Sequence, residues 1–315
     1  MPLRKNLTFL ILICIAVNVS SQNFTRPGEW KKYRKEVYIS IGASDFLGDL
    51  GGRNKAGTDF SPVDLNFALT KTAFGLGYRY KLQRWINVTT KFSYCIIQGD
   101  DAQTKDPFRN NRNLNFKSNI FELATRLEVG WESNKAGNRY GIKKTLNRRM
   151  KNNRHGIFLF GGIGVFYFNP KGRLPTGAYV KLRPLHTEGQ GLPDGPKQYS
   201  NYSICIPLGI YYKATINKQW TVGLEFSWRK TFTDYIDDVS TSYYDNNAIA
   251  AAYGTTAAKM ADPSLGNIPG ASYPDATGVA AQRGDKDLDT YITLEVTVGY
   301  IFKQKRKRAR LRSKF

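Results

Sequence analysis

Histidine and cysteine are scarce in this chain, which has two His and three Cys among its 315 residues. Cys95 and Cys205 lie far apart inside alternating apolar stretches, without the short spacing of a metal site. Two such cysteines cannot form the dense disulfide framework of a small secreted scaffold. We interpret them as small residues in the wall of a sheet, and we expect neither a metal-binding nor a disulfide-rich class.

Long hydrophobic runs are also missing, apart from one at the beginning. Residues 7–19 are apolar except for Thr8 and Asn18, follow Arg4 and Lys5, and precede a polar segment. This pattern is typical of a cleavable signal peptide, which we expect to span residues 1–22. Ile13 precedes Cys14 where a lipoprotein signal needs a small residue, so lipidation is not favoured. No later run approaches 18 apolar residues, which excludes a helical membrane protein.

What the chain does contain is a series of segments in which apolar and polar residues alternate. In the seventh of them, Trp220, Val222 and Leu224 alternate with Thr221 and Gly223. A period of two over ten or more residues predicts a long strand with different chemistry on its two faces. Eight such segments occur, at 35–46, 72–82, 85–98, 119–131, 156–168, 203–215, 219–232 and 289–302.

The length of these segments distinguishes between two all-β architectures. A soluble β-sandwich would use strands of about 5–6 residues, whereas a tilted strand that crosses a membrane needs roughly 9–11. Aromatic residues such as Trp85, Trp131 and Trp220 stand near segment ends, as in an interfacial girdle. The sequence therefore predicts an eight-stranded antiparallel transmembrane β-barrel over residues 36–302. Pro207, inside the sixth segment, indicates either a bulge or a wrong boundary.

The lengths of the connections predict an orientation. Residues 82–85 and 216–219 form tight turns, whereas 47–71, 99–118, 169–202 and 233–286 are long connections. Outer-membrane barrels have short periplasmic turns and longer extracellular loops. With a periplasmic N-terminus, both tight turns fall in the periplasm and all four long loops fall outside. We therefore expect both chain ends to be periplasmic.

The polar faces of the strands carry charges of both signs. Eight strands enclose only enough room for side chains, and an unpaired buried charge is costly. We therefore expect ion pairs that fill the interior and exclude a diffusion pore, with a gated small-solute channel as the alternative. The residues expected in these pairs are Arg79, Lys91, Glu122, Arg126, Glu128, Glu225, Arg229 and Glu295.

The segments on the predicted periplasmic side are strongly basic. They are the N-terminal segment 23–35, the connection 133–155 and a tail at 303–315. One interpretation is a solvated rim that attracts anionic lipid headgroups, and the other is a docking face for an acidic partner. An exported barrel does not routinely meet nucleic acid, so we expect none as a partner. The residues of the docking hypothesis are Trp30, Lys31, Lys32, Arg34, Lys143, Lys144, Arg148, Arg149, Lys151, Lys305, Arg306, Lys307 and Arg308.

Several stretches together resemble one family, the PorG-like outer-membrane proteins of the type IX secretion system. They are WKKYR at 30–34, GASDFLGDLGG at 42–52, GYRY at 77–80, RNLNFKSNIFEL at 112–123 and KTFTDYIDDVS at 230–240. The resemblance implies a structural barrel that associates with the periplasmic ring of the secretion machine, built from a lipoprotein and its partner. It brings no catalytic residues and no cofactor. A general outer-membrane anchoring or stabilising barrel is the alternative without a dedicated machine.

Catalytic and metal chemistry find little support in the sequence. We expect His155 at a periplasmic edge and His186 in an outer loop, where they cannot share a site with a nucleophile. The group Asp234, Asp237 and Asp238 has carboxylates that suit calcium, but its spacing matches no known loop, and we favour a role in loop packing. We therefore expect a protein that is not an enzyme. The Ala-rich stretch 248–258 receives no role.

Overall fold

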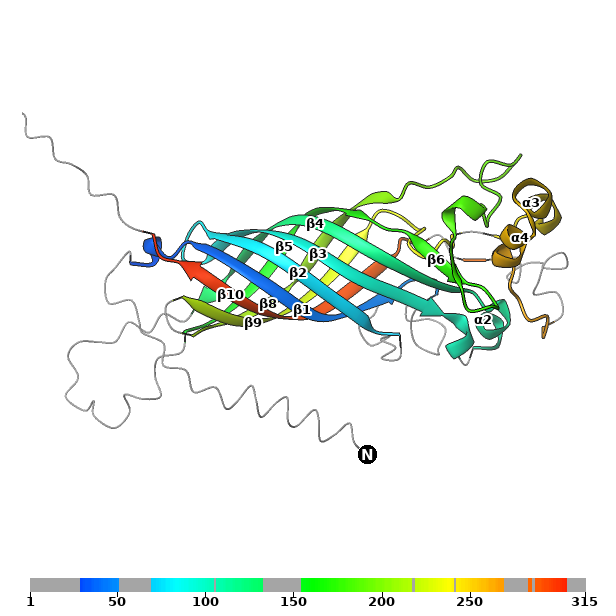
Figure 1. Ribbon diagram of the computed structural model, residues 1–315. Helices are drawn as coiled ribbons and strands as arrows, with labels where there is room; N and C mark the ends of the chain where they lie inside the picture. The colour runs from blue at the N-terminus through cyan, green and yellow to red at the C-terminus, as the bar shows by residue number, and fades with distance from the viewer. Residues whose placement is uncertain are drawn as a thin grey trace, which may run out of the picture.

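The computed structural model describes residues 29–50, 69–104, 106–132, 154–216, 219–240, 242–268, 283–284 and 287–304. Eight long strands pair in antiparallel fashion, and the pairing of β1 with β10 closes them into a barrel (Figure 1). The strands are β1 (Lys35–Leu47), β2 (Lys71–Lys81), β3 (Ile86–Asp100), β4 (Asn115–Glu132), β5 (Arg154–Tyr167), β8 (Tyr202–Ile216), β9 (Trp220–Thr231) and β10 (Thr290–Phe302). The predicted fold class is confirmed.

The barrel follows from the alternation of apolar and polar residues along each strand. In β1, Ile39 and Ile41 are exposed on the outer surface, while Tyr38 and Ser40, which alternate with them, are buried inside. In a strand, successive side chains point to opposite faces, so one register places the alternating apolar residues outside and the polar residues between them inside. No helix among the described residues is long and apolar enough to cross a membrane.

Pro207 lies within β8 and causes neither a bulge nor a strand end. The pairing of β5 with β8 stops after Gly161 and Leu208 and resumes at Gly164 and Cys205 in the same register. A bulge would shift the register by one residue. Because proline has no N–H to donate, the ladder is interrupted locally and then continues unchanged.

The two ends of the barrel differ, and we name them by their connections. At the turn end, residues 82–85 join β2 to β3, and the 3-10 helix η1 (Glu29–Lys32) precedes β1. There the backbone N–H of Gln304 donates to the carbonyl of Lys32 at 2.8 Å, which ties the segment after β10 to the segment before β1. At the opposite end, the loop end, the long connections of the barrel leave the strands (Figure 1).

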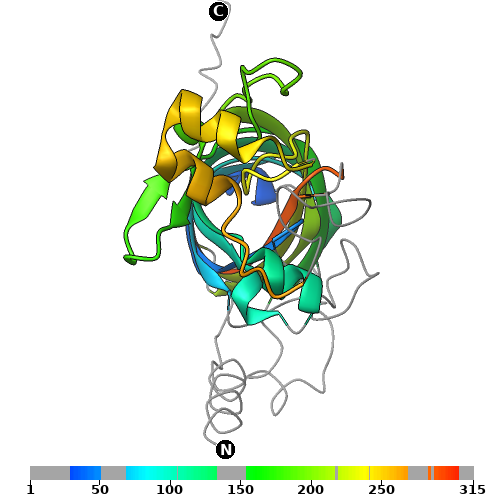
Figure 2. The ribbon, with the colours of Figure 1, turned by 90° about the vertical axis from the view of Figure 1, so that its right-hand side faces the viewer.

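The described parts of the connections at the loop end contain helices and short strands, which the sequence pattern did not predict. Seen from that end, α2, α3 and α4 lie around and over the rim of the barrel (Figure 2). β6 extends the sheet by pairing with β4, and β7 pairs with β6. These elements are η3 (Asp101–Gln103), α2 (Pro107–Arg112), β6 (Pro170–Arg173), β7 (Tyr179–Lys181), η4 (Arg183–Leu185), α3 (Asn246–Tyr253) and α4 (Thr255–Ala261).

We call these loop-end elements, together with the buried strap at 233–240, the cap. Ile236 and Val239 of the strap and Met260 of α4 belong to one buried apolar cluster with Phe46 and Phe166, which are strand residues at the loop end. Asp245 begins α3 by accepting the N–H groups of the next turn, as an N-cap residue does. The Ala-rich stretch therefore lies in the helices α3 and α4, of which α4 contributes Met260 to this cluster, while Ile249 of α3 packs with Ala257 and Ala261 in a second one.

Candidate functional site

The outer surface of the barrel carries the chemistry of a lipid-facing wall. Along β4, Leu123, Leu127 and Val129 are exposed, with Phe121 and Trp131 near the two ends of this apolar stretch. These two aromatic residues are ten positions apart, which at about 3.4 Å per residue and a tilt of about 40° spans roughly 26 Å along the barrel axis. This span agrees with the roughly 25 Å apolar band of membrane barrels. The exterior therefore suits a single lipid bilayer.

The interior of the same strands is charged, and its central group joins five residues. Lys91 on β3 donates to Glu225 on β9 at 3.0 Å and to Glu295 on β10 at 2.8 Å. Arg126 on β4 holds both carboxylate oxygens of Glu225. Ser40 on β1 donates to Glu295 at 2.5 Å. Five strands are thus linked across the interior by buried charge-assisted hydrogen bonds, which are stronger than neutral ones.

A second group lies next to it, towards the turn end. The Arg79 guanidinium binds Glu128 through two hydrogen bonds, of 2.7 and 3.1 Å, and lies 3.2 Å from Glu36. Lys213 completes the group with a 2.5 Å contact to Glu36. The rings of Tyr38 and Tyr211 lie 4.6 and 4.3 Å from the guanidinium carbon of Arg79. The planar guanidinium of Arg79 is therefore neutralised by carboxylates and also packs against aromatic rings.

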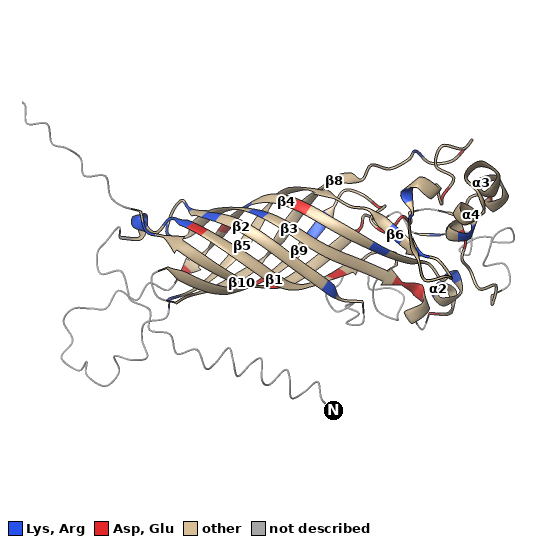
Figure 3. Cartoon of the chain, viewed as in Figure 1, with Lys and Arg blue, Asp and Glu red and all other residues tan. Residues whose placement is uncertain are grey.

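Smaller groups lie on either side of these two. Lys81 and Arg154 both pair with Glu132 at the turn end, at 2.5 and 2.8 Å. Nearer the loop end, Arg229 pairs with Glu122 at 2.9 Å. Figure 3 shows basic residues in blue and acidic residues in red on strands along the barrel. The residues of these four groups fill successive levels of the interior, as expected for eight strands, whose enclosed space is no wider than their side chains require.

The structure brings together all eight residues for which the sequence indicates lumen ion pairs. It also adds Glu36, Lys213, Glu132 and Arg154, which sequence reasoning missed. The signal for Glu36 and Lys213 was present, because each shares the face of polar residues in its own strand. Glu132 and Arg154 stand at the last and first positions of β4 and β5, beyond the alternation that the sequence shows clearly.

Acidic residues of the strap accept hydrogen bonds from other parts of the chain. Asp237 accepts the backbone N–H groups of Leu50 and Val239 at 3.3 and 3.0 Å. Asp238 accepts hydrogen bonds from Thr187 at 2.5 Å and Tyr199 at 2.6 Å. Within the described ranges, no group of three or more His, Cys, Asp or Glu side chains is arranged to hold a metal ion. The geometry of Asp237 and Asp238 supports the loop-packing role.

Burial changes the acidity of these strap carboxyls. Burial, opposed in part by the Arg283 guanidinium, raises the pKa of Asp238 to about 6. Burial together with the nearby carboxylates of Asp237 and Asp234 raises the pKa of Asp289 well above its usual range. Asp289 also accepts the N–H of Ile236 at 2.8 Å. Protonation of these carboxyls therefore favours the packed cap.

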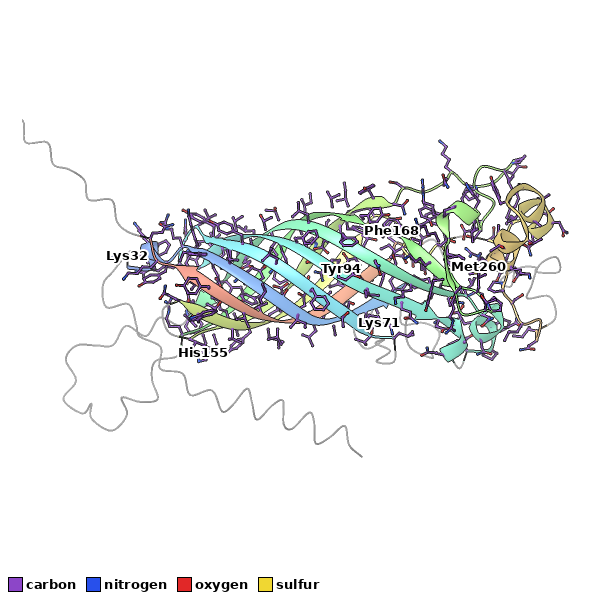
Figure 4. All side chains as sticks on the ribbon, in the orientation of Figure 1. Lys32, Lys71, Tyr94, His155, Phe168 and Met260 are labelled. Atoms are coloured by element: carbon purple, nitrogen blue, oxygen red, sulfur yellow. The ribbon has the colours of Figure 1, made fainter. Side chains whose placement is uncertain are left out.

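The two histidines lie at opposite ends of the barrel. His155, at the turn end near Lys32 in Figure 4, has its Nδ1 2.6 Å from the hydroxyl of Tyr212 on the outer surface. His186 is in the cap, where its ring stacks on Tyr253 at 4.2 Å and its Nδ1 lies 2.7 Å from the carbonyl of Gln190. The structure does not bring them together, and each has a packing role.

The described basic residues of the docking hypothesis are all at the turn end. Lys31 is exposed, and Trp30, Lys32 and Arg34 are half-buried. The Arg34 guanidinium lies 4.9 Å from the centre of the Trp30 ring and donates to the hydroxyl of Tyr80 at 3.3 Å. The remaining predicted residues, together with the signal segment 1–22, lie outside the described residues: Lys143, Lys144, Arg148, Arg149, Lys151, Lys305, Arg306, Lys307 and Arg308.

Comparison with known proteins gives one match to a protein family. The family, described as a domain of unknown function (DUF6089), matches residues 4–137, which is less than half of the chain. No curated protein matches this sequence.

Solved structures of small barrels are similar to this chain, with low scores. The attachment invasion locus protein Ail of Yersinia pestis, in complex with a heparin analogue, has 10% sequence identity and a TM-score of 0.33, over 85% of this chain and 99% of Ail. Neisserial surface protein A has 6% identity and a TM-score of 0.36, over 85% and 97%. The N-terminal barrel of OprF from Pseudomonas aeruginosa has 8% identity and a TM-score of 0.31, over 86% and 99%.

Proposed function

We propose that this chain is an integral outer-membrane component of the type IX protein secretion machinery, and that it docks a periplasmic ring through a basic turn end. The ring is the one that the PorG-like resemblance implies, a lipoprotein and its partner. The observation that carries the proposal is the closed barrel with an interior filled by ion pairs. Because ion pairs join facing strands across the described interior, we place the action of the protein at its two ends.

The orientation of the barrel follows from its connections. Outer-membrane barrels have their short turns in the periplasm and their long loops outside, so the turn end is periplasmic in this proposal. The chain segments before β1 and after β10 meet there, through the hydrogen bond of Gln304 to Lys32. Both basic termini of the chain therefore start from the same face, where a periplasmic ring would bind.

The docking chemistry is that of a cationic face for an acidic partner. Lys31 is exposed next to Trp30, a residue type that often anchors interfaces. The positive electrostatic field of such a face speeds the encounter with an acidic partner and orients it, and the field weakens as salt is added. The lipid-facing wall meanwhile keeps this face at the inner surface of the outer membrane.

Deletion of the gene tests the secretion role directly. We expect secreted cargo to be lost, and the intact gene to restore it. Normal secretion with only a fragile envelope would contradict the proposal and favour a general anchoring barrel.

A pull-down of the full-length protein tests the docking face. The variant Lys31→Glu with Lys32→Glu should recover less of the periplasmic ring than the intact protein, and the difference should shrink in high salt. Lys197→Glu with Lys259→Glu is the matched control, since both lysines are exposed in loop-end segments. A variant without residues 303–315 tests the tail in the same way. Equal recovery by all the variants would contradict docking through the turn end.

A further inference from the structure

Three lysines stand side by side on the sheet that extends the barrel at the loop end. Lys117 on β4 is directly opposite Lys171 on β6, and Lys171 is directly opposite Lys181 on β7. Residues in register on neighbouring strands point to the same face, at a strand spacing of about 4.8 Å. We call this row the lysine ladder. Figure 3 shows basic residues on the ribbon around β6.

Such a row has an electrostatic cost, because like charges directly opposite each other destabilise a sheet. The neighbouring Arg173 has a carboxylate partner, Asp100, at 3.3 Å. Among the described residues, no carboxylate pairs with Lys117, Lys171 or Lys181. Within the described ranges, the three cations are thus held together without an anion that would offset their repulsion.

The ladder occupies the outer face of this small sheet. Gly172 and Leu182, which alternate with the lysines, are buried on the other face, where a side chain at Gly172 would meet Met260 of α4. The cap therefore covers one face only. Lys181 is exposed and Lys171 and Lys117 are half-buried on the face that continues the outside of the barrel.

The ladder is continuous with the lipid-facing wall. Lys117 precedes Phe121 by four residues on the same face of β4. Phe121 belongs to a row of outward aromatic rings: its centroid is 5.0 Å from that of Tyr94 and 6.5 Å from that of Tyr167, which lies 5.1 Å from Tyr202. At the rise and tilt of barrel strands, Lys117 stands roughly 10 Å above Phe121 along the barrel axis.

The backbone of Lys117 thus lies just beyond the headgroups, since the polar layer on each side of a bilayer is about 5–8 Å thick. The long lysine stems let the ammonium groups bend back towards that layer. Lysine ammonium groups are also common ligands of phosphate. A lipid phosphate at this level would meet all three cations, with the aromatic row beneath them against its acyl chains.

We propose that the lysine ladder binds a phosphate-bearing lipid headgroup of the outer leaflet. In the outer membrane of a Gram-negative cell this lipid is lipopolysaccharide. The ring of Tyr179, 5.7 Å from the Lys117 ammonium, borders the site. The inference rests on the outer-membrane location and outward loops proposed above and does not depend on the secretion role.

Binding of fluorescent lipopolysaccharide to the full-length protein in neutral detergent tests this site. Near an anionic surface each lysine contributes about 1 kcal/mol, so the loss of two lysine charges alone should weaken binding about 30-fold. Lys171→Glu with Lys181→Glu also adds two negative charges and should weaken binding by more than this. The pair Lys197→Glu with Lys259→Glu makes the same change of charge at two exposed lysines outside the ladder and should alter binding less than about twofold. Lys171→Gln with Lys181→Gln replaces the first variant if it does not fold.

Two further arms identify the ligand. Lipopolysaccharide without its phosphates should bind the intact protein as weakly as the ladder variant binds the complete lipid. Soluble inorganic polyphosphate should bind the intact protein much more weakly than the lipid does. Equal affinity of the ladder and control variants, equal affinity with and without phosphates, or tight binding of polyphosphate at the ladder would each overturn the proposal. Since these assays use purified protein, loss of the secretion role would not affect their outcome.

Discussion

The interior of this barrel is filled in two different ways along its length. From the turn end to the level of Glu122, charged side chains from facing strands neutralise each other, as Lys91 does with Glu225 and Glu295. Towards the loop end the interior becomes apolar, and Phe46 and Phe166 pack there with residues of the cap. Both regions lie inside the same eight strands.

The difference shows which parts of the chain each region needs. The ionic region is built by strands alone, because every partner in the central group comes from a barrel strand. The apolar region is incomplete without loop residues such as Ile236 and Met260. We therefore expect damage to the ionic region to weaken the whole barrel, and damage to the apolar region to loosen the cap first.

The largest effect is expected from Glu225→Gln in the ionic region. This change removes the carboxylate that holds Arg126 through both of its oxygens, and it leaves that guanidinium only a 3.4 Å contact with Glu128, while Lys91 keeps Glu295. Removal of one partner of a buried ion pair typically costs about 3–5 kcal/mol. Urea unfolding of the reconstituted protein should show a loss of this size. Asp194→Asn, which neutralises an exposed carboxylate in the loop between β7 and β8, is the control and should cost less than about 0.5 kcal/mol. A similar small loss in both variants would contradict an interior held by ion pairs.

A smaller and more local effect is expected from Ile236→Ala in the strap. Ile236 is fully buried in the apolar cluster, and removal of a buried isoleucine side chain costs about 2–4 kcal/mol. Limited proteolysis should then cleave within the cap while the barrel stays folded, as its shifted gel mobility before heating would show. The exposed Leu265, changed to Ala, should leave the cap protected. Unfolding of the whole barrel in step with the cap would remove the distinction between the two regions.

Acidity should affect the cap and leave the ionic region unchanged near neutral pH. The folded cap raises the pKa of Asp238 to about 6, above the roughly 3.9 of an unfolded chain, so the folded state binds the proton more tightly. This contribution is complete below about pH 4 and is lost as the pH rises through about 6. We expect about 1–3 kcal/mol less cap stability at pH 7 than at pH 4, measured as proteolysis rates calibrated at each pH on an unfolded substrate.

Asp289→Asn sharpens this test, because Asn keeps an acceptor for the N–H of Ile236 and removes a charge next to Asp237. The variant should protect the cap better than the intact protein at pH 7 and equally well at pH 4. A cap that became more protected as the pH rose would contradict the assigned direction.

The smallest effect is expected on the lipid-facing surface. The hydroxyl groups of Thr90 and Thr125 are exposed there and lie 3.2 Å apart, paired with each other. Replacing both residues with Val removes two hydroxyl groups that are hydrogen-bonded to each other, so no partner is left unsatisfied. The barrel should therefore keep its stability to within about 0.5 kcal/mol. Urea unfolding of this variant and of Glu225→Gln under the same conditions compares their losses of stability. A loss of several kcal/mol in the Thr90 and Thr125 variant would mean that this pair is part of a packed interface.

The sequence predicted the ionic region well because both of its signals are local. Alternation places Arg79, Lys91 and Glu225 on the polar face of their strands, and a closed eight-stranded wall brings such faces together. The tight turns and long connections were also visible directly. The individual partners could not be read from the sequence, because they depend on the stagger of the strands around the barrel.

The apolar region was not predicted, because its inward residues break the alternation. Phe46 is next to Leu47, Ile97 is next to Ile96, and Phe166 lies between Val165 and Tyr167, so apolar residues occur on both faces of the strands there. That loss of alternation at the loop ends was the available signal for a folded cap. The packing of α3 and α4 depends on contacts between distant loops, which no local pattern encodes.

Conductance of the purified, full-length protein in planar lipid bilayers tests the central claim most directly, because an open channel conducts ions and a barrel with a filled interior does not. The account predicts a silent barrel across the physiological range of voltage, in membranes where a known porin conducts under the same conditions. Steady ion currents through the inserted intact protein would contradict it and return the small-solute channel as the better function.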